Sequence, residues 1–244
     1  RVPVGRIDTE SLSINNPTRY FTYILRATLR RSGLQIEGRA VDLDETQYSV
    51  DYEKQPNLRR LAVYHSPPLH ELVRVVNKES QNLYADQLFK TLGVHALPPN
   101  STRSRGSFKA GAAAVEEFLA DAGIDTASVQ LVDGSGLSRQ NLVSPRATTQ
   151  LLSTLWHHPN APAGDVFYES LPVGGMDGTL EFRFVRSPAR GNVRAKTGYL
   201  SNVRSLSGYV TTRDGTPLAF SFFCNNYTVE TDRVDEIQGE MVSR

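Results

Sequence analysis

The sequence predicts an α+β fold in which helices pack on an antiparallel sheet. Three observations predict it: helical segments fill the middle of the 244-residue chain, three strand-like segments follow one another near its end, and a last helix closes it. Consecutive strands joined by short turns pair in an antiparallel manner. A run of helices beside such a run of strands is the order expected of an α+β domain.

Start and stop signals predict the helices. The first follows Asn16 and Pro17 and ends at Gly33, because asparagine caps a helix, proline suits its first turn and glycine supplies a left-handed stop. The same signals predict helices near residues 69–77, 82–92, 108–123, 145–158 and 229–243, with the second of these ending at Gly93. Short strands are expected within residues 34–53 and 58–66. Residues 159–192 are expected to be rich in loops, with "VGGMDG" as their most flexible part.

Alternation of polar and apolar residues predicts the sheet. The segments "NVRAKTGYL", "VRSLSGYVTT" and "PLAFSFFCNN" are three successive strands, and Arg213-Asp214-Gly215-Thr216 is a tight hairpin between the last two. The polar, proline-bearing stretch "DYEKQPN" marks a domain boundary. We therefore predict one region over residues 1–56 and another over residues 57–244.

Composition excludes several classes of function. The net charge of +1 gives no bulk attraction to nucleic acid or to an anionic membrane. The single cysteine, Cys224, forms no intrachain disulfide. No glycine-rich phosphate loop, zinc motif or other cofactor motif is present, and no signal peptide opens the chain. The five histidines lack the spacing of a metal site; they are His65, His70, His95, His157 and His158.

The tripeptide Lys196-Thr197-Gly198 stands at the end of a predicted strand. An ammonium and a hydroxyl presented there suit an anionic ligand, and glycine lets a substrate backbone approach closely. The flanking arginines add a positive field that favours a carboxylate; they are Arg183, Arg186, Arg190, Arg194 and Arg204. For the tripeptide taken alone, a solvated strand with ordinary surface arginines is the simpler interpretation.

Ser80-Gln81-Asn82 lies between two predicted helices. Serine and asparagine at such a junction are typical helix caps. The same tripeptide type, Ser-x-Asn, also belongs with Lys-Thr-Gly and Ser-x-x-Lys to the motif set of penicillin-binding proteins and class A β-lactamases. Its position 116 residues before Lys196, with the two motifs on a helix junction and a strand, favours the second interpretation.

Three blocks together carry a family resemblance: "SPPLHELVRVVNKESQNLYADQLFKTLG", "VQLVDGSGLSRQNLVSP" and "VRAKTGYLSNVRSLSGYV". In this order they resemble the class C low-molecular-mass penicillin-binding proteins, the D-alanyl-D-alanine carboxypeptidases/endopeptidases of the penicillin-binding protein 4 type, peptidase family S13. The resemblance covers about residues 58–225, with "DGSGLSRQN" its most distinctive part. It implies a penicilloyl-serine transferase fold, peptidoglycan stem peptides as substrates, β-lactams as inhibitors and a periplasmic or extracytoplasmic location.

The resemblance also implies roles for individual residues. Lys196 would stabilise the substrate and the developing anion, and Thr197 would bind the terminal carboxylate, with Gly198 beside it. The backbone amide of Tyr199 would form part of the oxyanion hole. Ser80 would relay a proton to the leaving amine and Asn82 would orient the acyl-side amide. Ser135 and Arg139 would flank the side-chain pocket, where arginine can bind a stem-peptide carboxylate; a tight turn held by Asp133 explains that block equally well.

The chain has no recognisable nucleophile. In the family it resembles, lysine of Ser-x-x-Lys deprotonates the serine that becomes acylated. Three residues before the five lysines stand Asp51, Val75, Gln87, Gly106 and Val193, none of them serine. Ser187 and Ser201 are each followed three residues later by arginine, which does not act as a base at ordinary pH.

The resemblance offers an explanation for this gap. In the family, Ser-x-x-Lys lies near the N-terminus and a long inserted region separates it from Ser-x-Asn. Residues 1–56 would be the C-terminal part of that inserted accessory domain, and residues 57–244 the C-terminal part of the catalytic domain. We expect a missing N-terminal segment that carries the nucleophile and the strands that complete the sheet. The alternative is a non-catalytic peptidoglycan-binding homologue.

Overall fold

In the computed structural model, residues 13–42, 62–96, 106–157 and 161–243 are described. The chain divides into two compact units, Arg1–His65 and Ser66–Arg244. In the first unit, α1 (Pro17–Arg31) begins as predicted: the Asn16 side chain accepts a hydrogen bond from the Arg19 amide. Gly33 follows the helix with a φ of +87°, the left-handed conformation that ends it.

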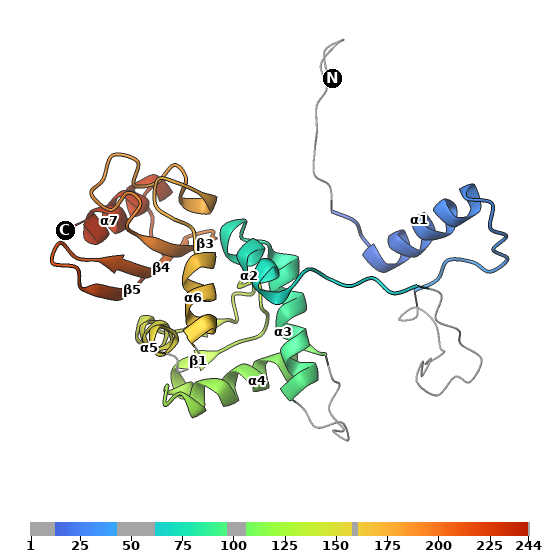
Figure 1. The fold of residues 1–244 in the computed structure, drawn as a ribbon, viewed down its shortest axis with the longest axis horizontal. Coiled ribbons are helices and arrows are strands. Elements are labelled where there is room, and N and C mark those ends of the chain that lie inside the picture. Colours follow the sequence, from blue (N-terminus) through green and yellow to red (C-terminus); the bar gives the residue numbers. More distant parts are fainter. Residues whose placement is uncertain (1–12, 43–61, 97–105, 158–160, 244) are drawn as a thin grey trace, which may run out of the picture. The chain divides into compact units, whose positions relative to one another are not determined.

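The second unit is built on the predicted meander. Strands β3 (Arg194–Leu200), β4 (Val203–Thr211) and β5 (Pro217–Asn225) form an antiparallel sheet in that order (Figure 1). Lys196 lies opposite Ser207, and the register continues without interruption along both pairs. The hairpin between β4 and β5 turns at Gly215, whose φ is +87°. The predicted antiparallel sheet is therefore confirmed.

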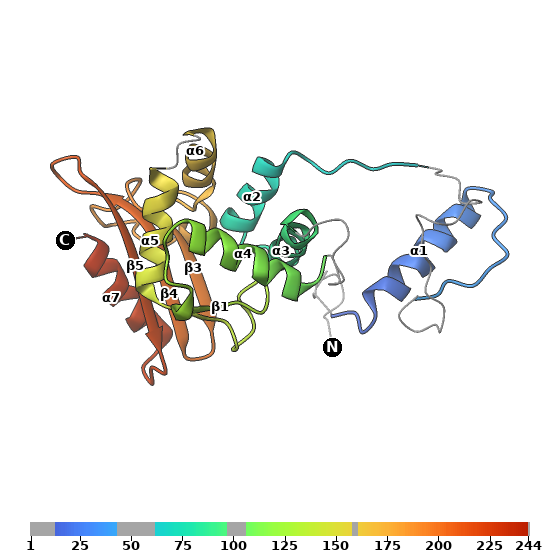
Figure 2. The ribbon, with the colours of Figure 1, turned by 90° about the horizontal axis from the view of Figure 1, so that it is seen from below.

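Two helices cover opposite faces of this sheet (Figure 2). Beneath α7 (Thr231–Ser243) lie the buried side chain of Leu206 and the neighbouring Val210 and Phe222. Against α5 (Pro145–Trp156) lies Tyr209, whose hydroxyl donates a hydrogen bond to the Leu152 carbonyl at 2.7 Å. Residues 206 and 210 point one way and residue 209 the other, as the two-residue period of a strand requires.

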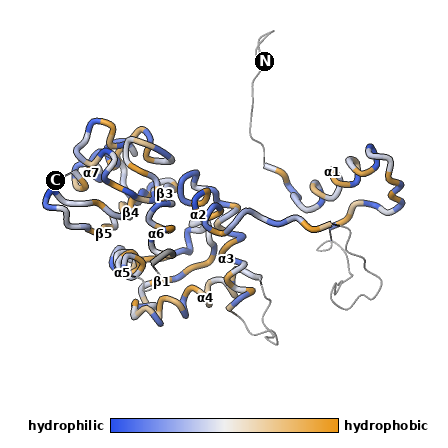
Figure 3. Tube along the Cα trace, viewed as in Figure 1, coloured by the Kyte–Doolittle hydropathy of each residue, from blue (hydrophilic) through white to orange (hydrophobic). Residues whose placement is uncertain are grey.

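The remaining helices extend from this sheet. They are α2 (Leu69–Lys78), α3 (Asn82–Ala96), α4 (Phe108–Asp121) and α6 (Ala161–Ser170). Short strands β1 (Val129–Gln130) and β2 (Leu142–Val143) pair with each other, and 3₁₀ turns occupy Thr126–Ser128 (η2) and Gly178–Leu180 (η3). The tube of α4 is largely hydrophobic (Figure 3), since alanines dominate it. Ser107 and Ser144 cap α4 and α5.

Some local features differ from the predictions. Helix α6 was not predicted and lies within the segment expected to be rich in loops, and Gly93 lies inside α3 instead of ending it. A side chain at Gly93 would stand 2.6 Å from the Gly111 amide nitrogen, so the glycine allows α3 and α4 to pack closely. No strand occurs in residues 34–42 or 62–66; the rest of those two predictions lies outside the described residues.

The segment "VGGMDG" makes backbone hydrogen bonds to residues outside it. The Gly174 amide donates to the Val193 carbonyl at 2.9 Å, and the Gly175 amide to the Leu180 carbonyl at 2.9 Å. Within the part of the chain that the structure describes, no helix is long and apolar enough to cross a membrane.

Candidate active site

The outer edge of β3 is the centre of the site. The Ala195 amide donates to the Pro172 carbonyl at 3.0 Å, on the side away from β4. Backbone groups of alternate residues in a strand point the same way, so the Tyr199 amide and the Thr197 carbonyl also face away from β4. Beyond Ala195 this edge therefore presents a donor and an acceptor outward, beside Lys196.

Lys196 and Ser80 meet in the structure. The Lys196 Nζ donates to the Ser80 Oγ at 2.8 Å and to the Thr197 carbonyl at 3.0 Å. Burial lowers the pKa of Lys196 to about 8, because desolvation disfavours the charged form. The two motifs that stand 116 residues apart in sequence are thus in direct contact.

The backbone at Ser80 departs from helical conformation. Its φ is +55°, an unusual value for a residue other than glycine. Its hydroxyl faces Lys196, while the side chain of Gln81 accepts the hydrogen bond of the Leu83 amide at the start of α3. The helix-capping interpretation is therefore wrong for Ser80. Asn82 is the first residue of α3 and is exposed.

An ion pair that the sequence did not reveal supports the junction between α2 and α3, where Ser80 lies. The ammonium of Lys78, a buried residue at the end of α2, lies 2.6 and 2.8 Å from the two carboxylate oxygens of Asp177. Burial alone would raise the pKa of Asp177, but the hydrogen bonds from Lys78 and the Val173 amide hold it below its usual value. The pair spans 99 residues, and nothing local in the sequence indicated it.

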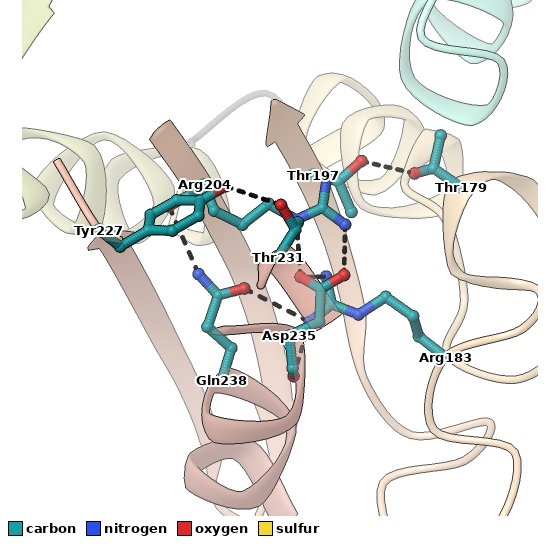
Figure 4. A network of polar contacts seen from close by, with 8 residues as sticks. All are labelled: Thr179, Arg183, Thr197, Arg204, Tyr227, Thr231, Asp235 and Gln238. Atoms are coloured by element: carbon teal, nitrogen blue, oxygen red, sulfur yellow. Dashed lines mark hydrogen bonds and ion pairs between the residues drawn. The ribbon is translucent and has the colours of Figure 1, made fainter. Parts of the chain in front are cut away.

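A second threonine lies beside Thr197. The Thr197 hydroxyl donates to the Thr179 hydroxyl at 2.9 Å (Figure 4). Thr179 belongs to the η3 turn, which follows Asp177 directly. Thr179 was not among the predicted site residues, because a lone threonine in a glycine-rich loop gives no signal of its own.

The "DGSGLSR" block is a turn held by two carboxylates. Asp133 accepts hydrogen bonds from the Gly136 and Ser138 amides at 2.7 and 2.8 Å, as the turn interpretation requires. Asp86 of α3 accepts from the amides of Gly134 and Ser135 at 3.0 and 2.9 Å. It thereby ties the block to the helix that begins with Asn82.

Arg139 brings the block to the β3–β4 turn. Its guanidinium donates to the Ser201 carbonyl at 3.1 Å, and its side chain is otherwise exposed. Ser201 follows β3 directly, so Arg139 lies near the end of the strand that carries Tyr199. The structure thus brings Ser80, Lys196 and Thr197 together and sets Arg139 at one end of the same strand.

Three of the five arginines predicted to give a positive field beside Lys196 have partners in the structure. Asp235 of α7 engages Arg204 through both of its oxygens, at 2.5 and 2.6 Å, and lies 3.2 Å from Arg183 (Figure 4). The Arg194 guanidinium lies 4.8 Å from the ring centroid of Tyr168. Three of the five arginines therefore make structural contacts, which periodicity and local charge could not reveal.

Gly198 also lies close to a side chain of the neighbouring strand. A side chain at this position would stand 2.3 Å from the Ser205 Oγ of the neighbouring strand. This oxygen ends a side chain that can rotate, so the contact adds to the predicted reason for glycine, the close approach of a substrate backbone, and does not replace it.

The histidines and acids form no metal cluster in the described ranges. His157 ends α5, where its Nδ1 lies 2.9 Å from the Ser153 carbonyl, and His158 lies outside the described residues. The Lys196–Ser80 contact remains the chemically distinctive feature of this unit.

Comparison with known proteins assigns the family. The model of the D-Ala-D-Ala carboxypeptidase 3 (S13) family matches residues 5–244. The chain belongs to this family.

Two relatives illustrate the similarity. The chain is 33% identical over 220 residues to the D-alanyl-D-alanine carboxypeptidase DacB of Haemophilus influenzae, covering 89% of this chain and 42% of the relative. It is 34% identical over 221 residues to a D-alanyl-D-alanine carboxypeptidase of Actinomadura sp., covering 88% and 38%. The family member therefore spans less than half the length of these relatives.

Solved structures of similar proteins agree with this family assignment and with the predicted fold. Penicillin binding protein 4 (dacB) of Haemophilus influenzae superimposes with a TM-score of 0.74 at 32% identity, covering 93% of this chain and 48% of that one. The TLA-3 extended-spectrum β-lactamase gives a TM-score of 0.54 at 17% identity, covering 71% and 61%, and supports the fold alone. The S13 chain thus has the predicted α+β, β-lactamase/transpeptidase-like fold.

Proposed function

We propose that this S13 chain supplies one wall of the active cleft of a serine-type D-Ala-D-Ala carboxypeptidase/endopeptidase. Its substrates are peptidoglycan stem peptides, and β-lactams inhibit it. The observation that carries this proposal is the contact of Lys196 with Ser80 at 2.8 Å beside the outward edge of β3. The activities named for the relatives, and a similar penicillin binding protein 4 solved with a β-lactam, support it.

Each group at the cleft has a role in this proposal. The Tyr199 amide, which faces away from β4, donates to the oxyanion of the tetrahedral intermediate. Thr197 and the ammonium of Lys196 bind the terminal D-alanine carboxylate, with Gly198 beside them. Asn82 orients the amide on the acyl side of the scissile bond.

The reaction proceeds through an acyl-enzyme. A serine oxygen forms an ester with the carbonyl carbon of the penultimate D-alanine, and the carbon–nitrogen bond to the last D-alanine breaks. Ser80 gives its proton to the leaving amine and takes up the proton that the attacking serine loses, so it ends the step as a neutral hydroxyl. Its contact with Lys196 supports this role, because the nearby ammonium stabilises a hydroxyl oxygen that is losing its proton. Water then hydrolyses the ester and restores the serine.

The nucleophile comes from outside residues 1–244 in this proposal. No Ser-x-x-Lys occurs among these residues, and the relatives are more than twice as long as the part that matches. Within the described residues β5 pairs only with β4, so an N-terminal segment of the same protein has a strand edge on which to complete the sheet. The proposal places the whole protein in the periplasm or another extracytoplasmic space.

Ser135 and Arg139 bind the side chain of the stem peptide. The exposed guanidinium of Arg139, fixed near the end of β3 by Ser201, suits the free carboxylate of a diaminopimelate-type residue.

Release of D-alanine tests the proposal. The longer protein, with the segment that precedes Arg1, is expected to release D-alanine from a diacetyl-L-lysyl-D-alanyl-D-alanine peptide. The Ser80→Ala variant is expected to be slower by about two orders of magnitude, the usual contribution of a proton-transfer group. A folded longer protein without any release would instead favour the non-catalytic peptidoglycan-binding homologue.

A further inference from the structure

Thr179 and Thr197 present two neighbouring hydroxyl groups at the edge of the site. Their oxygens lie 2.9 Å apart, with Thr197 as the donor (Figure 4). A hydroxyl has one proton and two acceptor positions, so this bond leaves the Thr179 proton available for another acceptor. Thr179 is exposed and Thr197 is half-buried, so a ligand can reach both.

Neighbouring residues on both sides of Thr179 in the chain hold it in position. Leu180, the next residue, is completely buried in the core beneath α7. Asp177, two residues earlier, accepts hydrogen bonds from the Lys78 ammonium and, at 2.8 Å, from the Val173 amide. A threonine between a core leucine and an ion-paired aspartate is held in place before any ligand arrives.

Gly178 lets this turn lie against the end of α2. Its φ is +54°, and a side chain there would stand 2.7 Å from the Lys78 carbonyl oxygen. Lys78 precedes Ser80 by two residues, as Asp177 precedes Thr179 by two. The ion pair therefore connects the segment that carries Ser80 to the segment that carries Thr179.

Both segments contact consecutive residues of β3. Ser80 meets Lys196, and Thr179 meets Thr197. The next side chain on the same face as Thr197 is Tyr199, whose ring lies 5.5 Å from the guanidinium carbon of Arg204. Among the described residues, the hydroxyl that lies next to the Thr197 hydroxyl is that of Thr179.

We infer that Thr179 is a specificity-determining residue that binds, together with Thr197, the terminal carboxylate of substrates and inhibitors. A carboxylate is an acceptor with two oxygens, and two hydroxyls 2.9 Å apart can each donate to one of them once the Thr197 proton turns outward. Lys196 supplies the charge beside them. The inference rests on the proposed function, and Asp177 and Lys78 serve as positioning residues.

Substitution of Thr179 in the longer protein tests it. Thr179→Val removes the hydroxyl at nearly constant shape, Thr179→Ser keeps it, and Thr154→Val is a matched control whose hydroxyl bonds only its own helix. Three measurements are made: kcat/KM for diacetyl-L-lysyl-D-alanyl-D-alanine, kcat/KM for its C-terminal amide, and the inhibition constant of phenylboronic acid. The last two ligands lack the carboxylate.

The Thr179→Val variant is expected to lose about ten- to a hundredfold in kcat/KM on the free acid, the effect of one hydrogen bond to a charged group. It should keep the wild-type values for the amide and for phenylboronic acid. Thr179→Ser and Thr154→Val should act as the wild type does on all three.

Two results overturn the inference while the proposed function stands. One is a Thr179→Val variant with unchanged activity on the free acid. The other is an equal loss with all three ligands, which indicates a structural role. A wild-type longer protein that releases no D-alanine and does not bind phenylboronic acid overturns the proposed function, and the inference with it.

Discussion

Raising the pH from 7 to 10 is expected to stabilise the folded chain through Lys196. Burial lowers the pKa of this ammonium from 10.5 to about 8, whereas the unfolded chain keeps the proton up to the ordinary value. Between these two pH values the unfolded state binds more protons than the folded state. The free energy of unfolding therefore rises with pH across this window.

The expected gain follows from the two pKa values. One pH unit of difference corresponds to about 1.36 kcal/mol, so the drop from 10.5 to about 8 amounts to roughly 3 kcal/mol in full. Most of it, about 2.5 kcal/mol, is gained by pH 10. Burial raises the pKa of Tyr209 above its ordinary value, and this residue therefore destabilises the fold at still higher pH. The comparison accordingly ends at pH 10.

Urea unfolding at pH 7, 8, 9 and 10 measures the effect. The wild type should gain stability between pH 8 and 10, and Lys196→Met should lack that gain because methionine does not titrate. Lys109→Met, which removes an exposed lysine of α4, is the matched control and should keep it. Parallel pH profiles for the wild type and Lys196→Met would refute the burial argument.

Three further predictions concern other parts of the unit. Asp177→Asn should destabilise the fold by about 1 to 2 kcal/mol, because the buried Lys78 ammonium loses its partner; urea unfolding measures this, and the difference from the wild type should shrink in acid as Asp177 becomes protonated. Gly208→Ala should cost about 3 kcal/mol or more, since the added carbon would stand 2.1 Å from the Arg194 carbonyl oxygen; a melting temperature equal to that of the wild type would contradict it. Arg139→Gln in the longer protein should lower kcat/KM about tenfold for stem peptides with a free side-chain carboxylate, and a similar loss on the amidated peptides would contradict a role in carboxylate binding.

Local signals predicted most of the helices and the sheet. Ser107 and Ser144 bond the third amide of their helices, which is the chemistry on which the start signals rest. The meander followed from alternation alone. No periodicity relates residues 116 positions apart, so only the family resemblance implied that Ser80 and Lys196 belong to one cleft; their direct contact was not predicted.

Tertiary contacts decided what the sequence did not reveal. In the sequence, Gly93 is typical of a residue that ends a helix. In the structure it lies inside α3 and packs against Gly111 of α4, a contact between two helices that no local pattern indicates. Helix α6 was not predicted; a side chain at Gly164 would stand 2.5 Å from the Leu155 carbonyl oxygen, so this glycine lets α6 pack closely against α5. Thr179 became visible only when the fold brought it to Thr197.

Covalent labelling by a fluorescent penicillin tests the central claim most directly. The longer protein, with the segment that precedes Arg1, should form a stable adduct on a serine of that segment, located by mass spectrometry of its peptides. Residues 1–244 alone should remain unlabelled under the same conditions. An adduct on any serine of residues 1–244, or a folded longer protein that takes up no label, would contradict the account.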